Sequence, residues 1–151
     1  MSTDTAIQGC REVPLRLIVE DRGFLLAGQV FEQVPFQTAR FFVVGNVPSG
    51  EVRGRHAHRA GEQLLVALAG SLVVDAWSGA GHQRHVLRAG GNALHVPPDT
   101  FTCQSQFSGD ALLLVLCSNT YDVADYIEAE EFFAGSPHSS VPEAMGVLAD
   151  G

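Results

Sequence analysis

The sequence predicts an all-β domain, a sandwich or barrel of short strands with a single helix near the C-terminus. Three observations predict this class. Short apolar and β-branched runs recur along the chain, turns that contain Gly or Pro separate them at intervals of about ten residues, and only one stretch has apolar residues at helical spacing. At 151 residues, of which 46% are hydrophobic, the chain can bury the core of one domain.

The predicted strands follow a loose lead-in over residues 1–12. The first covers residues 13–20 and is interrupted by Pro14, whose ring and missing N–H disfavour a continuous strand. Further strands are expected over residues 24–27, 39–44, 53–58, 64–69, 71–77, 83–87, 93–96, 101–107 and 111–117. The longest apolar runs, at 64–69 and 111–117, are typical of strands in the centre of a core.

The one helix is expected over residues 122–133. Its signal is the helical spacing of Tyr126, Ile127, Glu130 and Phe133. Residues 134–151 are rich in Ser, Pro and Gly and are expected to form a flexible tail. The strands and the helix therefore make a single domain over residues 13–133.

The chain is acidic. Its 9 basic residues are all arginine and stand against 17 acidic ones, for a formal net charge of -8. This balance argues against nucleic acid or a membrane surface as a partner. Arginines that cluster locally could still bind an anionic ligand.

Cysteine use and hydropathy indicate a cytoplasmic protein. The cysteines are Cys10, Cys103 and Cys117, an odd number without a Cys-x-x-Cys pair. The first residues lack the basic and apolar regions of a signal peptide. No apolar run reaches the roughly eighteen residues of a membrane helix.

One stretch is the candidate active site. His56 and His58 are two residues apart, so on a strand both imidazoles point to the same face. The apolar run over residues 64–69 follows them and fits a buried strand. Two imidazoles on one wall of a dry interior could hold a metal ion or move protons.

The spacing around these histidines resembles the first motif of the cupin family. Five residues separate Gly50 from His56, and counting back from Gly70 places Gln63 where the motif has Glu. In the second motif, Asp99 and Thr102 replace the usual Gly and His. The resemblance implies a cupin fold, a double-stranded β-helix (jelly-roll) barrel. Because an amide and a hydroxyl are poor transition-metal ligands, no metal cofactor is expected.

A closer resemblance is to the nucleotide-sugar 3,4-ketoisomerases that act on dTDP-4-keto-6-deoxyglucose, the WxcM-like and FdtA-like sugar isomerases. Four segments carry it: Asp21-Arg22-Gly23, Arg53-Gly54-Arg55-His56-Ala57-His58 with Glu62-Gln63, Pro97-Pro98 before Phe101, and Tyr121-Asp122 with Asp125-Tyr126-Ile127. Two positions depart from the family. Phe41-Phe42 replaces a Tyr-Tyr pair, and Phe101-Thr102 replaces Trp-His.

The resemblance implies a metal-independent isomerase that moves the keto group of a dTDP-linked sugar from C4 to C3. Imidazole titrates near neutrality and suits the proton transfer, so His56 is expected to be the principal base and His58 its partner, with their order left open. The expected substrate-binding residues are Arg22, Arg40, Arg53, Gln63, His95 and Tyr121. Since arginine pairs with phosphate oxygens, Arg22, Arg40 and Arg53 form the expected diphosphate clamp. His95 could face the lumen or be structural.

Three other interpretations stay open at this stage. The chain could be an epimerase or dehydratase, because these reactions also begin by removing a proton next to a ketone. It could bind a nucleotide sugar without turnover. It could be a metal-dependent cupin oxygenase in which His95 joins His56 and His58. The resemblance also implies a homodimer that pairs through an exchanged N-terminal strand, which would bury a sheet edge.

Overall fold

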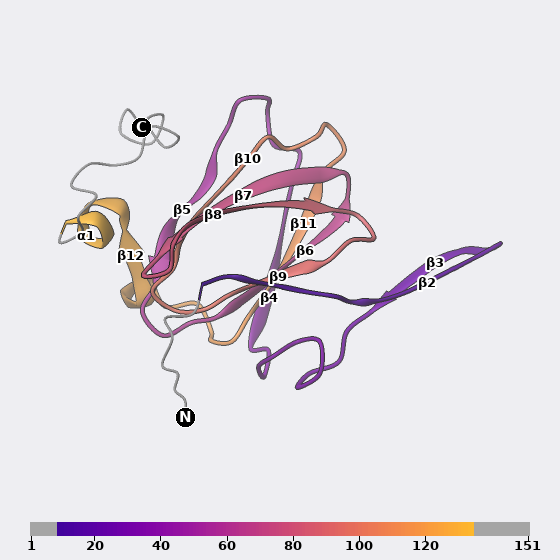
Figure 1. Cartoon of the computed structure of the whole chain (residues 1–151), viewed down its shortest axis with the longest axis horizontal. Coiled ribbons are helices and arrows are strands. Elements are labelled where there is room, and N and C mark those ends of the chain that lie inside the picture. Colours follow the sequence, from indigo (N-terminus) through magenta and orange to yellow (C-terminus); the bar gives the residue numbers. More distant parts are fainter. Residues whose placement is uncertain (1–8, 135–151) are drawn as a thin grey trace.

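Strands dominate the structure, a computed structural model that describes residues 9–134 and confirms the all-β class (Figure 1). The predicted strand runs are present with shifts of a few residues at their ends. The strands are β1 (Arg11–Val13), β2 (Arg16–Glu20), β3 (Gly23–Ala27), β4 (Arg40–Gly45), β5 (Arg53–His58), β6 (Gln63–Ala69), β7 (Ser71–Ser78), β8 (Gly81–Arg88), β9 (Ala93–Val96), β10 (Phe101–Ser105), β11 (Leu112–Cys117) and β12 (Tyr126–Glu128).

Two five-stranded sheets face each other, in the orders β1-β9-β6-β11-β4 and β12-β5-β10-β7-β8. The main core lies between them. It joins Leu65 of β6 and Val115 of β11 from the first sheet to Val74 and Ala76 of β7 from the second. Because side chains alternate along a strand, these residues define which positions of each strand point into the barrel interior.

The outer face of the first sheet carries a second apolar cluster. Leu64 and Val66 of β6 point outward there and pack with Val13, Val34 and Phe36. The run over residues 64–69 is apolar on both faces because both faces are covered, as expected of a central strand.

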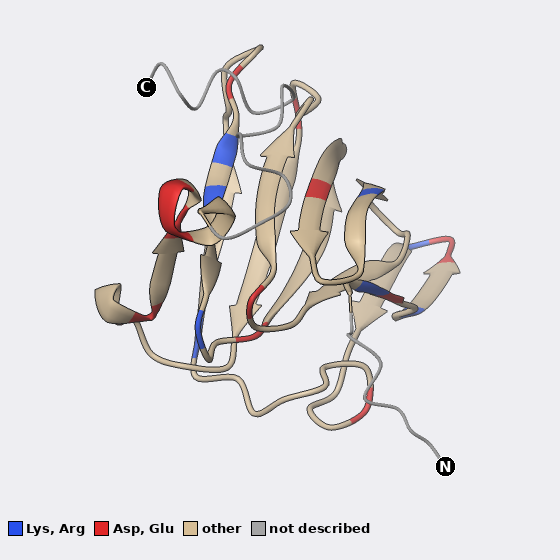
Figure 2. Ribbon diagram, turned by 60° about the vertical axis from the view of Figure 1, so that its left-hand side comes forward, with Lys and Arg blue, Asp and Glu red and all other residues tan. Residues whose placement is uncertain are grey.

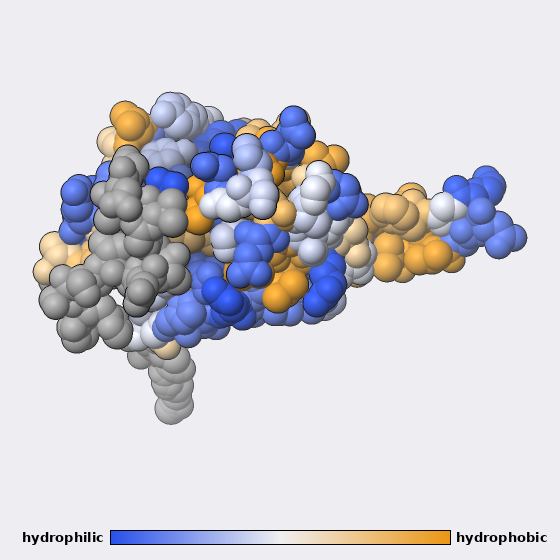
Figure 3. All heavy atoms as spheres, turned by 90° about the horizontal axis from the view of Figure 1, so that it is seen from above, coloured by the Kyte–Doolittle hydropathy of each residue, from blue (hydrophilic) through white to orange (hydrophobic). Residues whose placement is uncertain are grey.

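A separate two-stranded hairpin, β2-β3, projects from the body (Figure 1). Its sides are hydrophobic and its tip is hydrophilic (Figure 3). Pro14 separates it from β1, so the strand predicted over residues 13–20 is two strands that belong to different sheets. β1 begins at Arg11, inside the predicted lead-in.

The helix predicted over residues 122–133 is wrong for most of its length. This segment contains the 3₁₀ turn η1 (Val123–Asp125), then β12, and only then the helix α1 (Ala129–Phe133). β12 pairs with the open edge of β5, and Ile127 packs into a cluster with Phe101 and Phe133. Backbone pairing with β5 outweighs a helical pattern too short to be stable alone.

The helix α1 carries Glu130 and Glu131 in its first turn, and Figure 2 shows this acidic helix beside β12. Cys10, Cys103 and Cys117 are buried and unpaired. Within residues 9–134, no helix is long and apolar enough to cross a membrane. The predicted tail over residues 134–151 lies, except for Ala134, outside the described residues, as do residues 1–8 of the lead-in.

Candidate active site

His56 and His58 point into the barrel interior from β5, which confirms the prediction that they share a face. Their ring centroids are 5.2 Å apart and the rings are nearly perpendicular, at 85°. His56 pairs across the sheet with Thr102, which in turn pairs with the core residue Ala76. Both imidazoles are therefore held on rigid strands next to the core.

A row of polar side chains on the opposite sheet faces these histidines. Arg40 of β4 pairs with Cys117 of β11, and Cys117 pairs with Gln63 of β6, so the three lie side by side across the sheet. Gln63 Nε2 is 3.4 Å from His58 Nε2 and 3.9 Å from Cys117 Sγ. Its neighbour Glu62 points to the other face, as strand alternation predicts for the residue beside the motif position.

Tyr126 covers both imidazoles. β12 places it opposite His58 in the strand pairing, and its ring centroid lies 4.7 Å from that of His56 and 4.5 Å from that of His58. Arg40 Nη2 donates a hydrogen bond of 3.4 Å to the Tyr126 hydroxyl. A phenol, a guanidinium and two imidazoles are thus in mutual contact in the barrel interior.

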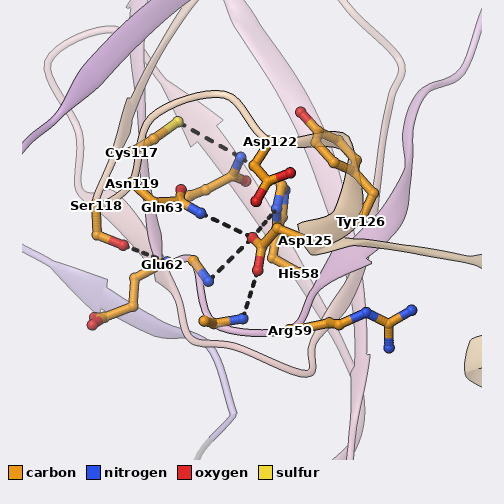
Figure 4. A network of polar contacts seen from close by, with 12 residues as sticks. His58, Arg59, Glu62, Gln63, Cys117, Ser118, Asn119, Asp122, Asp125 and Tyr126 are labelled. Atoms are coloured by element: carbon orange, nitrogen blue, oxygen red, sulfur yellow. Dashed lines mark hydrogen bonds and ion pairs between the residues drawn. The ribbon is translucent and has the colours of Figure 1, made fainter.

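A buried carboxylate stands behind His58 (Figure 4). His58 Nδ1 lies 3.0 Å from Asp125 Oδ2, within hydrogen-bond distance, and the exposed fractions of the two side chains are 7% and 8%. The amide of Asn119 also donates to Asp125 Oδ2, at 3.1 Å. Backbone N–H groups of the β5–β6 turn, at Ala60 and Gly61, complete its shell.

The surroundings set different protonation states for the two histidines. Burial, and then repulsion from His58, lowers the pKa of His56 to about 4, against a smaller upward effect from the Gly54 backbone. Burial also lowers the pKa of His58, but the hydrogen bond and charge of Asp125 act upward. Both imidazoles are therefore available as neutral bases near neutral pH, and His58 is the one with a carboxylate partner.

Burial keeps Tyr126 and Cys117 protonated. It raises the pKa of the Tyr126 phenol, against a downward effect from Arg40. It also raises the pKa of the Cys117 thiol. At neutral pH the phenol can therefore donate a hydrogen bond to a ligand oxygen, and the thiol is not a nucleophile.

The family of the chain follows from comparison with known proteins. The family model FdtA, described as WxcM-like, C-terminal, matches residues 8–136. The chain belongs to the FdtA family. It is 33% identical over 121 residues, 80% of this chain and 87% of the relative, to a TDP-4-oxo-6-deoxy-alpha-D-glucose-3,4-oxoisomerase of Aneurinibacillus thermoaerophilus.

Solved structures agree with the assignment to the FdtA family. The WlaRB TDP-quinovose 3,4-ketoisomerase of Campylobacter jejuni superposes with a TM-score of 0.77 at 32% identity, covering 83% of this chain and 98% of that one. A double mutant of the QdtA 3,4-ketoisomerase of Thermoanaerobacterium thermosaccharolyticum, in complex with TDP, gives 0.78 at 26% identity, covering 82% and 90%.

The other predicted site residues occupy different places in this FdtA-family fold. Tyr121 lies at the exposed edge of the site, with its ring 5.9 Å from that of Tyr126 and 5.7 Å from the Arg40 guanidinium carbon. Arg53 is exposed at the start of the strand that carries the histidines. Arg22 is at the tip of the β2-β3 hairpin, where it contacts Glu20, and Figure 1 shows this tip far from β5 and β12.

His95 does not point into the barrel interior. It pairs in register with Leu64, an outward-facing residue of β6, and its Nε2 lies 2.8 Å from Glu62 Oε1. Its ring also contacts Phe36 of the outer cluster. The expectation that His95 could join His56 and His58 in the lumen is therefore wrong, because β9 turns this position to the other side of the sheet.

The sequence interpretation missed Asp125 and Tyr126 as members of the site. Both belong to the Asp-Tyr-Ile segment that carries part of the family resemblance, but their spacing was interpreted as a helix. The sequence signal that could have found them is this Asp125-Tyr126-Ile127 segment itself, and the pairing of Tyr126–Glu128 with the edge of β5 places it beside the histidines.

The phenylalanines that replace the family's tyrosines are split between two faces. Phe42 pairs with the core residue Val115 and points inward, 5.9 Å from the Arg40 guanidinium carbon. Phe41 points outward and is 66% exposed. The phenolic group nearest the histidines in this chain is therefore that of Tyr126.

The described side chains around the histidines do not form a set of metal ligands. Among residues 9–134, no three His, Cys, Asp or Glu side chains converge as ligands. The two motif positions beside the histidines hold Gln63 and Thr102, whose amide and hydroxyl groups are weak ligands for transition metals.

Proposed function

We propose that this protein is a sugar-nucleotide 3,4-ketoisomerase, which converts a dTDP-linked 4-keto-6-deoxyhexose to its 3-keto isomer in deoxysugar biosynthesis. The observation that carries the proposal is the pair of neutral imidazoles on one strand, enclosed by Tyr126, Arg40 and Gln63, in a chain of the FdtA family. The Aneurinibacillus relative bears the name of this activity at 33% identity.

The reaction needs a base beside a carbon acid. The C4 ketone acidifies the hydrogen on C3, and its removal by His56 gives an enediolate. The imidazolium exchanges its proton with solvent and returns a proton to C4, while His58 moves a proton from the C3 hydroxyl to the C4 oxygen. No oxidant or reductant is consumed. Two imidazoles 5.2 Å apart can reach adjacent carbons and their oxygens in this way.

The negative charge of the enediolate needs donors already in place. Arg40 donates a hydrogen bond to the protonated phenol of Tyr126. The Gln63 amide lies beside His58, on the same side of the interior. Donors held by strands cost little reorganisation when charge develops on the substrate. These donors would stabilise the enediolate charge, as a metal ion does in other enzymes, and we propose a metal-independent reaction.

We further propose that the enzyme is a homodimer in which each hairpin covers its partner. The hairpin exposes Val19 at 73% and Phe24 at 61%, and the outer face of the first sheet exposes Phe41 at 66% and Val43 at 51%. A cavity of about 350 Å³ lies between the base of the hairpin and this face. Unpaired apolar surfaces of this kind mark an interface.

This dimer gives Arg22 a role in substrate binding. Its side chain is 88% exposed at the hairpin tip and remote from the histidines of its own chain. An exchanged hairpin would carry it to the partner, where it could bind the diphosphate together with Arg40 or Arg53. Tyr121, at the rim, is placed to contact the nucleotide. The unpaired cysteines fit the cytoplasm, where we place the reaction.

The product of the reaction tests this proposal. Purified protein is incubated with dTDP-4-keto-6-deoxyglucose, with and without a chelator, and the sugar is analysed by NMR. The proposal expects a 3-keto-6-deoxy sugar at the same rate in both samples. Binding without conversion would identify a non-catalytic module, and loss of activity with the chelator would identify a metal enzyme.

A further inference from the structure

Asp125 is a buried carboxylate that the proton transfers above do not use. We propose that it is a positioning residue, which fixes the protonated nitrogen of His58 at Nδ1 and thereby leaves Nε2 as the working nitrogen toward the substrate. The inference rests on the proposed function for its catalytic meaning, but the protonation pattern it assigns can be measured without turnover.

The first argument is the shell of donors around the carboxylate. Asp125 Oδ1 accepts from the Ala60 N–H at 2.9 Å. Asp125 Oδ2 accepts from the Gly61 N–H at 3.3 Å and from Asn119 Nδ2 at 3.1 Å, and it lies 3.0 Å from His58 Nδ1. Three of these partners, the Ala60 and Gly61 N–H groups and the Asn119 amide nitrogen, can only donate, so the site suits an ionised carboxylate.

The charge state follows from this shell. Burial alone would raise the pKa of Asp125, but the bonds from Ala60, Asn119 and His58 outweigh burial and hold the pKa below its usual value. An ionised carboxylate has no hydrogen to give. His58 Nδ1 must therefore carry the hydrogen of this bond.

The second argument comes from the other side of the ring. In a neutral imidazole with hydrogen on Nδ1, Nε2 has a free lone pair. Gln63 Nε2 lies 3.4 Å from it, and an amide N–H can donate to that lone pair. The partners on both sides of the ring thus agree on one tautomer, and Gln63 makes only a long contact that a substrate hydroxyl could displace.

The third argument is that several contacts hold Asp125 in a fixed position. The Arg59 N–H donates to the Asp125 carbonyl at 2.8 Å, and the Arg59 side chain pairs with Glu131 of α1. A Cβ at Gly61 would lie 2.8 Å from Asp125 Oδ2, so the carboxylate occupies space that only glycine leaves open. The turn after β5 and the segment before β12 therefore fix Asp125 relative to His58.

The consequence is a division of labour between the two imidazoles. Among residues 9–134 no carboxylate contacts His56, whereas His58 has a carboxylate partner that supports its protonated form. A histidine that shuttles a proton between two sugar oxygens must be protonated and deprotonated in each turnover, and Asp125 stabilises the protonated stage. The titratable groups that face His58 from the surrounding strands are His56, Arg40, Cys117, Tyr126 and Asp125.

The substitution Asp125→Asn removes the negative charge of the side chain and keeps its shape. Asparagine has nearly the same size, and with its oxygen in the Oδ2 position it can still accept from Gly61, Asn119 and His58. Only the charge and the bond to Ala60 are lost. The matched control is Asp122→Asn, because the Asp122 carboxylate is exposed and accepts from the Ala124 N–H in η1, and asparagine caps such turns equally well.

Nitrogen-15 NMR of the histidine rings tests the inference directly. In the wild-type protein at neutral pH we expect His58 to show hydrogen on Nδ1, and the opposite tautomer would overturn the inference without any variant. In Asp125→Asn we expect the His58 titration to move to lower pH, since the carboxylate that raised its pKa is gone, and kcat to fall by about 10²-fold with KM little changed.

The control and the failure outcomes are distinct. Asp122→Asn should keep the wild-type titration and kcat. If Asp125→Asn lowers only the melting temperature and leaves the His58 titration and kcat unchanged, Asp125 is a structural brace and the inference is wrong. If the NMR results hold but the wild-type protein converts no keto sugar, the proposed function fails while the assigned tautomer stands.

Discussion

His56 should make the protein sensitive to acid, and the size of the effect can be worked out from its surroundings. Its pKa is about 4 in the folded protein, because burial and the neighbouring His58 disfavour its charged form, and about 6.5 in an unfolded chain. Between these values the unfolded state binds a proton that the folded state does not, so stability falls as the pH is lowered through this window. From about pH 7 to about pH 4.5 the loss attributable to His56 is about 2 kcal/mol.

Urea unfolding at the two pH values measures this loss. The wild-type protein and His56→Asn are compared at one protein concentration, and the quantity of interest is the difference between their two pH-dependent changes in free energy of unfolding. Asparagine cannot take up the proton, so the variant should lose about 2 kcal/mol less than wild type on acidification. Equal losses in both proteins would show that His56 is not held neutral by the fold.

Three further perturbations test the site and the dimer. Arg40→Met should raise the KM for the keto sugar on the order of tenfold and move the His58 titration to higher pH, because Arg40 lowers the pKa of His58; an unchanged KM and titration would exclude this role. Gly61→Ala should lose about 1–3 kcal/mol in thermal or urea unfolding, because the new Cβ would lie 2.8 Å from oxygens of both Asn119 and Asp125; a wild-type melting temperature would contradict it. Val43→Asp should give a monomer by light scattering while Val86→Asp, 47% exposed on the other sheet, stays dimeric; a dimeric Val43→Asp would place the interface elsewhere.

Much of the fold could be predicted because its signals are local. The alternation around His56 and His58 placed both imidazoles on one face, and the same rule separated Gln63 from Glu62. Pro14 marked the break between β1 and β2. These features depend on strand periodicity and on the missing N–H of proline, which act within a few residues.

The errors arise where pairing between distant segments decides the structure. Tyr126, Ile127 and Phe133 fit a helix by spacing alone, but the edge of β5 draws residues 126–128 into a strand. The same pairing brings Asp125 to His58 across 67 residues of chain. Whether His95 faced inward depended on the register of β9 with β6, which local sequence does not specify.

The most direct test of the central claim is conversion of dTDP-4-keto-6-deoxyglucose in heavy water by the wild-type protein and by His56→Asn, followed by NMR of the sugar. The account predicts that the wild type forms the 3-keto sugar with deuterium entering the ring at C4, and that His56→Asn forms neither product nor deuterated substrate while still binding the nucleotide sugar. Wild-type conversion by His56→Asn would contradict the claim that this imidazole carries the carbon-bound proton.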